Sequence, residues 1–313
     1  MSGSSHPKPP ARNGVGPSCI GLPAGPWSTT LDFLAERFKA VARAVWHQRM
    51  LDGDVVDEHG HTLAPDTPYQ AHVRVYYYRD VPHEPRIPFE EVILFQDEQL
   101  VVVDKPHFLP VVPSGAYLNE TVLVRLKQKL GIDTLVPVHR IDRDTAGLVM
   151  FSVQPATRAV YHALFSQRTV QKTYEAIAPW RADLVFPLTR TSRMVEAGHF
   201  MLQHEVDGPP NATTEMDVLE VQGTLARYRL KPITGKRHQL RVHMAALGLP
   251  LVGDGLYPTL TPEGQIDYAN PLQLLAKSVE FTDPVSGQHR RFESERQLTL
   301  PALPTPGSAF ASR

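Results

Sequence analysis

Residues 139–150 read HRIDRDTAGLVM, and this stretch places charged side chains directly in front of an apolar run. His139, Arg140 and Asp142 fall within four positions, and the apolar run occupies residues 148–150. An apolar run that follows turn residues is typical of a buried strand. A carboxylate beside such a strand needs a partner, because burial without one drives it toward the neutral form. Asp142 is therefore either a structural turn residue paired with an arginine or a reactive carboxylate held by one.

Strand patterns outnumber helix patterns in the main body of the chain, which begins at Phe89. Their order is not a regular alternation of strand and helix, so we expect an α+β fold with a mixed, mainly antiparallel sheet and flanking helices. The expected strands lie at 91–105, 172–180, 214–233 and 272–283, and the expected helices at 122–130, 154–168 and 237–248.

Composition divides the chain into five parts. Residues 1–26 are rich in Pro, Gly and Ser and are expected to be disordered, and residues 301–313 form a similar flexible tail. Residues 27–80 combine helical spacing with turns and short strands, which predicts a small domain of two helices and a hairpin. Residues 81–88 contain three prolines and are expected to be a linker to the main domain, residues 89–300.

The overall composition is that of an ordinary globular protein, with a net charge of -1. Cys19 is the only cysteine, which excludes an internal disulfide and a cysteine-based zinc site. No apolar run of about 18 residues and no secretory signal is found, so we expect a cytoplasmic protein with no membrane partner. Between Glu220 and Asp254 the charged residues are all basic, which indicates a solvated basic face or a surface for nucleic acid.

Familiar catalytic motifs are missing. The sequence has no GxSxG, GxGxxG or HExxH motif, and TGKRH at 234–238 lacks the upstream glycine of a phosphate loop. His238 and His243 are five positions apart, which is poor spacing for one face of a helix, so no metal site is expected. Asp142 remains as the candidate nucleophile or acid–base group, with Arg241 as the candidate guanidinium that keeps it ionised.

Five separated stretches, taken in order, resemble the motifs of the RluA-type pseudouridine synthases. The stretch HRIDRDTAG resembles the signature HRLDxxTSG of that family, and KTYEA resembles its KxYxA strand. PITGKRHQLRVHMAALGLPLVGDGLY resembles TGRTHQIRVHLxxxGHPIxGDxxY almost end to end. The resemblance covers about residues 90–298, and its matched stretches lie at 93–115, 139–147, 172–176, 232–257 and 271–287.

The resemblance implies the pseudouridine synthase fold and the isomerisation of uridine in RNA to its C-glycoside, without metal or cofactor. It implies that Asp142 is the catalytic aspartate and that Arg241 forms a salt bridge with it. Tyr174 matches the tyrosine that stacks on the target uracil, and Arg140 matches the arginine that fills the space left by the flipped base.

Departures from the family pattern fall outside these four positions and bear on substrate contacts. Ile141 replaces Leu, Ala146 replaces Ser, Lys236 and Arg237 replace an Arg-Thr pair, and Leu275 stands where the family often has His. Ile141, Val149 and Leu240 are expected to line the pocket and exclude water. Besides Arg140, the side chains predicted to bind RNA are His139, Ile141, Thr145, Lys172, Lys236, Arg237, His238, Gln239 and Leu240.

The chemistry requires a base outside its stack, which costs a few kcal/mol. Stacking on Tyr174 would return about 1–3 kcal/mol. Asp142 would then attack the sugar or assist loss of the base through a glycal, and the sequence does not choose between these routes. A glycoside or phosphate hydrolase would need a second carboxylate or a metal near Asp142, and Asp144 is expected to face outward.

The predicted partner is RNA, with large-subunit ribosomal RNA first and tRNA second, and the protein is expected to act as a monomer without an obligate protein partner. A non-catalytic RNA-binding protein of the same fold is the alternative. The stretch at 50–75 weakly resembles a ribosomal-protein-type RNA-binding module, so the small N-terminal domain is expected to bind RNA or to be a helical cap.

Overall fold

The structure is a computed structural model that describes residues 9–81, 83–198, 202–261 and 266–300. The chain divides into two compact units. The first contains Met1–Arg86 and Pro113–Asp133, and the second contains Ile87–Val112 and Thr134–Arg313. Residues 113–133 had been expected in the main domain and instead belong to the first unit.

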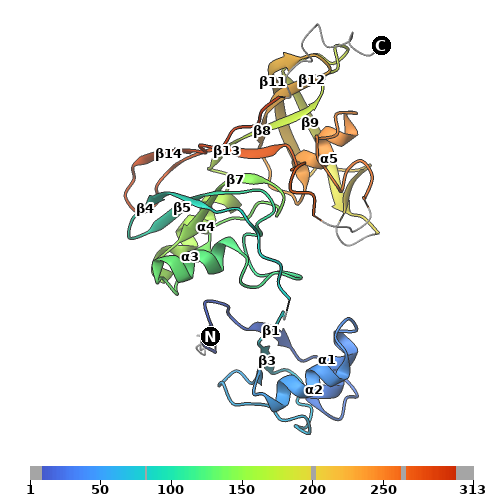
Figure 1. Cartoon of the computed structure of the whole chain (residues 1–313), viewed down its shortest axis with the longest axis vertical. Coiled ribbons are helices and arrows are strands. Elements are labelled where there is room, and N and C mark those ends of the chain that lie inside the picture. The colour runs from blue at the N-terminus through green and yellow to red at the C-terminus, as the bar shows by residue number, and fades with distance from the viewer. Residues whose placement is uncertain (1–8, 82, 199–201, 262–265, 301–313) are drawn as a thin grey trace, which may run out of the picture. The chain divides into compact units, whose positions relative to one another are not determined.

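The first unit is built from short helices and a small antiparallel sheet (Figure 1). The two helices predicted for its first half are present, and Thr29 and Asp32 form a reciprocal capping box at the start of the first. Apolar side chains of both helices, including Phe33 and Trp46, share one core with the sheet. The unit contains α1 (Thr30–Arg37), α2 (Arg43–Leu51), α3 (Val122–Leu130), β1 (Ser18–Gly21), β2 (Val55–Val56) and β3 (Arg74–Tyr77), with sheet order β1-β3-β2.

The expectation that residues 1–26 are disordered is contradicted for part of that segment. Strand β1 pairs along its whole length with β3, and Leu22 is buried with Ile20 packed beside it. Pairing with β3 satisfies the backbone of this Gly-rich stretch, and the two apolar side chains offset its ordering entropy. Residues 1–8 and the predicted tail, 301–313, lie outside the described residues.

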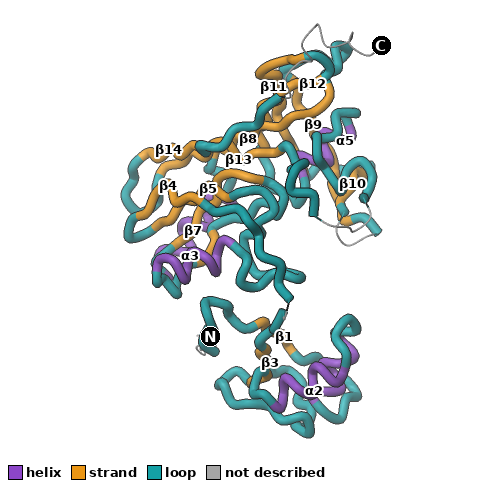
Figure 2. Tube along the Cα trace, in the orientation of Figure 1, coloured by secondary structure: helices purple, strands orange, loops and turns teal. Residues whose placement is uncertain are grey.

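The second unit is dominated by one mixed sheet, in which strands and loops far outweigh helix (Figure 2). Its order is β10-β9-β11-β12-β8-β13-β7-β5-β4, with β14 paired to β13 and β6 paired to β7. The β7–β13 pair is parallel and the other described pairs are antiparallel, which confirms the predicted fold class. The strands are β4 (Val92–Gln96), β5 (Leu100–Lys105), β6 (Val136–Pro137), β7 (Ala146–Ser152), β8 (Gln171–Pro179), β9 (Leu188–Glu196), β10 (Gln203–Val206), β11 (Ala212–Gln222), β12 (Leu225–Pro232), β13 (Leu274–Thr282) and β14 (His289–Glu293).

Two helices pack on this sheet and complete its core. Tyr161 and Leu164 of α4 (Arg158–Ser166, preceded by the short helix η1, Pro155–Thr157) pack with β5, β7 and β13. Leu240 and Met244 of α5 (Gln239–Ala246) pack with β8, β11, β12 and β13. Helix α5 is thereby fixed to the part of the sheet that also holds the central strands.

Gly147 lets β7 approach β13 closely. Its φ is +105°, and a methyl group there would lie 2.3 Å from the carbonyl oxygen of Ala276. The positive φ and this close contact each exclude a residue with a side chain at this position. The Gly of the opening stretch therefore sets the parallel contact that anchors the turn before β7.

Candidate active site

Asp142 lies in the turn between β6 and β7, and buried groups hold the backbone of this turn. The amide of Thr145 donates to the carbonyl of Asp142 at 3.2 Å. Lys105, at the end of β5, donates from Nζ to the carbonyl of Arg143 at 2.8 Å. It also donates to two carbonyls of its own loop at 2.9 and 2.8 Å. The three donors of the ammonium group are thus all used to join the β5 loop to the turn.

Two side chains that hold this turn were not among the predicted site residues. Lys105 is fully buried, and burial lowers its pKa to about 7, although the charges of Asp144 and Asp142 oppose the shift. His107 donates from Nδ1 to the carbonyl of Asp144 at 2.7 Å, and burial lowers the pKa of His107. The Lys-Pro pair of the matched loop at 93–115 was the available signal for Lys105.

Arg241 joins Asp142 to a second carboxylate, that of Asp254. Its Nη1 donates to Oδ2 of Asp142 at 3.2 Å. Its Nε and Nη2 donate to the two oxygens of Asp254 at 2.9 and 2.6 Å. The side chains of Arg241 and Asp254 are 2% and 1% exposed, whereas that of Asp142 is 27% exposed. The bidentate pair with Asp254 therefore fixes the guanidinium, which presents one further N–H to the accessible Asp142.

Asp254 also binds the backbone that follows it. Its Oδ1 accepts the amides of Leu256 and Tyr257 at 2.8 and 3.1 Å. Burial lowers the pKa of Arg241, but the hydrogen bonds and charge of Asp254, and then the charge of Asp142, outweigh burial and raise that pKa above its ordinary value. No role was predicted for Asp254, although its Gly-Asp pair lies within the matched block at 232–257.

Tyr174 lies on β8, half-buried against the core cluster that contains Leu240. On β13, Ala276 pairs with Tyr174 of β8 on one side and with Gly147 of β7 on the other. One strand, β13, therefore separates Tyr174 from β7, the strand that follows the Asp142 turn. Burial, and then the charge of Asp142, raise the pKa of Tyr174 above its ordinary value, so its phenol is neutral at pH 7. Within the described residues, no side chain or backbone group hydrogen-bonds its hydroxyl.

Arg140 is exposed, and among the residues that the structure describes no carboxylate pairs with it. The nearby carboxylate of Asp144 pairs instead with Arg143, at 2.8 Å. Ile141, between Arg140 and Asp142, is half-buried.

His139 was predicted to bind RNA, and in the structure its ring contacts protein groups. Its ring stacks on Phe165 with centroids 4.3 Å apart, and Nε2 accepts the amide of Met150 at 3.2 Å. Burial, with a smaller effect of Lys172, lowers the pKa of His139 to about 3. The neutral ring of His139 accepts a hydrogen bond from β7 and packs on α4, so it helps to fix the turn.

The other residues predicted to bind RNA form two groups at the loop before α5, one exposed and one bound to protein groups. Lys236 and Arg237 are exposed. Gln239 had been predicted to contact RNA, but it is buried and its amide binds protein groups of the loop and of β11. Lys172 donates to the carbonyl of Thr234 at 3.2 Å and so supports the same loop.

Three residues expected in contact with substrate lie in the interior. Leu240 belongs to the core under α5, and Val149 belongs to a fully buried stretch of β7. Thr145 is 2% exposed. A motif match gives position along the chain and not the direction of a side chain, so it does not by itself separate a pocket residue from a core residue.

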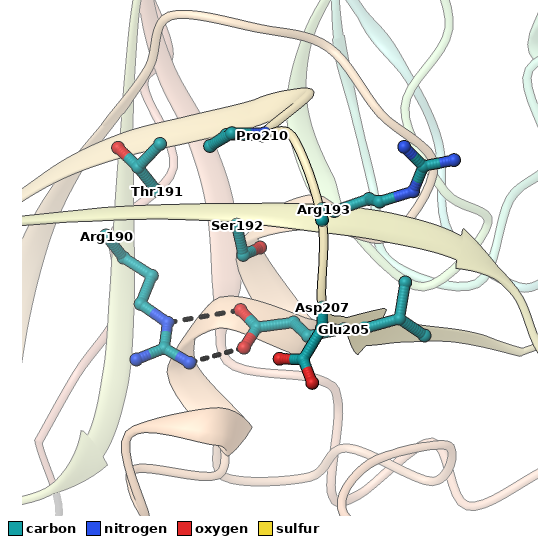
Figure 3. Close-up of a pocket in the computed structure, with 9 residues that line it drawn as sticks. Arg190, Thr191, Ser192, Arg193, Glu205, Asp207 and Pro210 are labelled. Atoms are coloured by element: carbon teal, nitrogen blue, oxygen red, sulfur yellow. Dashed lines mark hydrogen bonds and ion pairs between the residues drawn. The ribbon is translucent and has the colours of Figure 1, made fainter.

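A separate polar hollow of about 510 Å³ lies between β9 and β10 (Figure 3). Arg190 forms a two-pronged ion pair with Glu205 along its wall, with Nε 3.1 Å from Oε1 (Figure 3). Arg193 and Asp207 also line it, and neither was predicted to be functional. Over the described ranges, no group of three His, Cys, Asp or Glu side chains could hold a metal ion, and no helix is long and apolar enough to cross a membrane.

Comparison with known proteins identifies the class. The family described as RNA pseudouridylate synthase matches residues 99–246. The dual-specificity RNA pseudouridine synthase RluA of Salmonella typhi is 33% identical over 68% of this chain and 94% of the relative. The mitochondrial tRNA pseudouridine(32) synthase of Saccharomyces cerevisiae is 30% identical over 56% of this chain and 39% of its own. The human RNA pseudouridylate synthase domain containing 1 superposes with a TM-score of 0.55 at 21% identity, over 68% of this chain and 86% of that one, which shows the shared fold.

The fold and the matched segment define an RNA pseudouridine synthase, an intramolecular isomerase that modifies RNA. Within that class, the chain belongs to the RluA family.

Proposed function

We propose that Asp142 is the nucleophile, or the group that assists departure of the base, in the isomerisation of a uridine. The 3.2 Å contact between Arg241 Nη1 and Asp142 Oδ2 carries the proposal, because it places an accessible carboxylate against a buried, fixed cation. In the reaction, the bond from C1′ to N1 of uracil breaks, C1′ joins C5, the proton leaves C5 and N1 gains one. Either route uses the carboxylate in its ionised form, for which a fixed guanidinium is the complement.

The target base has to leave its stack to meet Asp142, and two neighbours are proposed to support the flipped state. Tyr174 offers a half-buried ring whose hydroxyl has no hydrogen-bond partner among the described residues, which suits stacking on the everted uracil at about 1–3 kcal/mol. Arg140 offers an exposed guanidinium without an ion pair among the described residues, which suits the space that the base vacates and the phosphates beside it.

Large-subunit ribosomal RNA is the first proposed substrate and tRNA the second. One relative is named a dual-specificity RNA pseudouridine synthase and another a tRNA pseudouridine(32) synthase, which supports tRNA as a candidate beside a second class of RNA. Exposed Lys236 and Arg237 beside the site are proposed to contact the phosphate backbone, which either RNA provides. The first unit is proposed to add RNA contacts, and the cytoplasmic location stays a prediction.

The test is chemical mapping of pseudouridine after incubation of total RNA from cells that lack the protein with wild type or Asp142→Asn. We expect new modified positions with wild type and none with the variant. An exposed carboxylate, Asp267, hydrogen-bonds Asn270 and serves as the matched control as Asp267→Asn, which is expected to modify like wild type. Identical maps for wild type and Asp142→Asn would refute the assignment, and the positions in the wild-type map identify the RNA.

A further inference from the structure

His238 lies directly before α5, and its ring connects Tyr257 to Asp142. Its Nδ1 is 2.9 Å from the hydroxyl of Tyr257, and its Nε2 is 3.8 Å from Oδ1 of Asp142. The other carboxylate oxygen, Oδ2, accepts from Arg241. The two oxygens of Asp142 thus face two different side chains at the same end of one helix.

The hydrogen bonds of Tyr257 decide which nitrogen of His238 carries the proton. The phenol oxygen accepts the amide N–H of Gln203 at 2.8 Å, and Tyr257 is only 8% exposed. Its own proton needs an acceptor, and in the described part of the chain the hydrogen-bonding partner left for it is Nδ1 of His238. A neutral imidazole whose Nδ1 accepts carries its proton on Nε2, the atom that faces Asp142.

The surroundings keep this ring neutral. Burial is the largest effect and lowers the pKa of His238, and a proton on Nδ1 would also confront the phenol as a second donor. The charged groups that act on His238 are Asp142 and Asp254, which raise its pKa, and Arg241 and Arg237, which lower it.

The backbone of His238 adds a second, independent observation. Its φ of 55° and ψ of 16° lie in the left-handed region, which is strained for a residue with a Cβ. Such strain persists where the surrounding structure fixes it, and it is common at functional sites. In this conformation the ring reaches both Tyr257 and Asp142.

We propose that His238 is a positioning residue for Asp142, a neutral imidazole whose Nε2–H holds Oδ1 while Arg241 holds Oδ2. The proposal rests on the role of Asp142 proposed above. The 3.8 Å separation closes when the Asp142 side chain, 27% exposed, rotates under bound RNA, because catalytic hydrogen bonds commonly tighten only with substrate. Each carboxylate oxygen has two lone-pair directions, so one donor on each leaves one free for the ribose.

The experiment measures the single-turnover rate of pseudouridine formation, RNA affinity and the pH–rate profile. His238→Phe removes the donor and is expected to slow the reaction 10- to 100-fold, with RNA affinity changed less than threefold. His238→Gln places an amide N–H near the position of Nε2 and is expected to recover most of the rate. Tyr257→Phe removes the hydroxyl that fixes the proton on Nε2, so both neutral tautomers become available and the rate is expected to fall, but by less than in His238→Phe.

His243 provides the matched control, since it lies on the same helix, is fully buried and contacts Ser192 and Thr214 rather than Asp142. His243→Gln is expected to lower the melting temperature and leave the acidic limb in place. Equal rates for His238→Phe and wild type, or equal losses for His238→Phe and His238→Gln, would overturn the proposal. Should His238→Phe fail to fold, the rates of His238→Gln and Tyr257→Phe decide, and wild-type rates in both would overturn the proposal. Activity in Asp142→Asn would instead refute the proposed function itself.

Discussion

Substitution of Asp254 by Asn tests whether the buried pair with Arg241 organises the site. The carboxylate of Asp254 accepts two hydrogen bonds from Arg241 and two from backbone amides, and its side chain is 1% exposed. An amide has one acceptor oxygen and one donor nitrogen in place of two acceptors. In Asp254→Asn, at least one N–H of Arg241 or of the backbone therefore faces another donor.

The magnitude follows from the burial of both partners. Breaking a buried ion pair by neutralising one member costs about 3–5 kcal/mol. For a unit of the size of residues 87–112 and 134–313, each kcal/mol lowers the melting temperature by about 2–4 °C, so we expect a fall of roughly 6–20 °C. Catalysis should also fall, because a charge-assisted hydrogen bond is worth about 1.5–3 kcal/mol, or roughly 10- to 150-fold in rate.

The assay combines thermal melts, followed by circular dichroism, with single-turnover pseudouridine formation at a temperature where the variant is folded. Asp183→Asn is the matched control, because Arg181 and Asp183 form the same two-pronged pair on an exposed surface. We expect no measurable change for it. If Asp254→Asn melted within 2 °C of wild type and reacted at the wild-type rate, Arg241 would not depend on Asp254 and the reasoning would be refuted.

Three further predictions concern the turn, the base and the stability of the fold. Lys105→Met leaves three carbonyls without their donor, so unfolding measurements in urea should show a loss of about 2–5 kcal/mol, and the rate should fall because the Asp142 turn is released. Tyr174→Ala removes the stacking surface, so kcat/KM should fall roughly 5- to 150-fold, and an unchanged value would exclude stacking. His139 and His243 have folded-state pKa values lowered by burial to about 3 and about 4, so below pH 6.5 protons bind the unfolded chain first and stability is lost as the pH falls. Urea unfolding at pH 7.5 and 5.5 should differ by about 1.4 kcal/mol for each histidine, and replacing either by Phe should remove its share.

The pattern of apolar residues predicted the sheet because its strands alternate or are fully buried, and that signal is local. Gly131 ends α3 in the left-handed conformation, which glycine adopts at no steric cost. At the start of α3, Thr121 accepts the amide of Val124, whereas Asn119 is engaged with Glu84. Two polar side chains within two positions compete for one cap, and tertiary contacts decide between them.

The position of Asp142 and its pairing with Arg241 were predictable, because the motif fixes both residues in the chain. The side chains that hold the Asp142 turn in place were not predictable from the sequence. Lys105 binds a carbonyl 38 positions away, and His139 is occupied by an amide of the strand that follows it. Nothing in residue type separates a histidine that faces RNA from one that braces a turn, because the difference is the direction of the ring.

The charge pattern of the site explains why charged residues stand directly before the apolar strand in residues 139–150. Asp142 and Asp254 share one guanidinium, so the cluster carries one net negative charge where a negatively charged polymer has to bind. Arg140 and Lys236 are exposed and are proposed to act on the phosphates through solvent, whereas Arg241 contacts Asp142 from the interior. Removing a surface cation should therefore weaken RNA binding in a salt-dependent way, and removing the buried one should slow the chemistry at any salt concentration. Arg140, two positions before Asp142 in the sequence, and Arg241, which contacts it in space, are therefore expected to act in separate steps, RNA binding and chemistry.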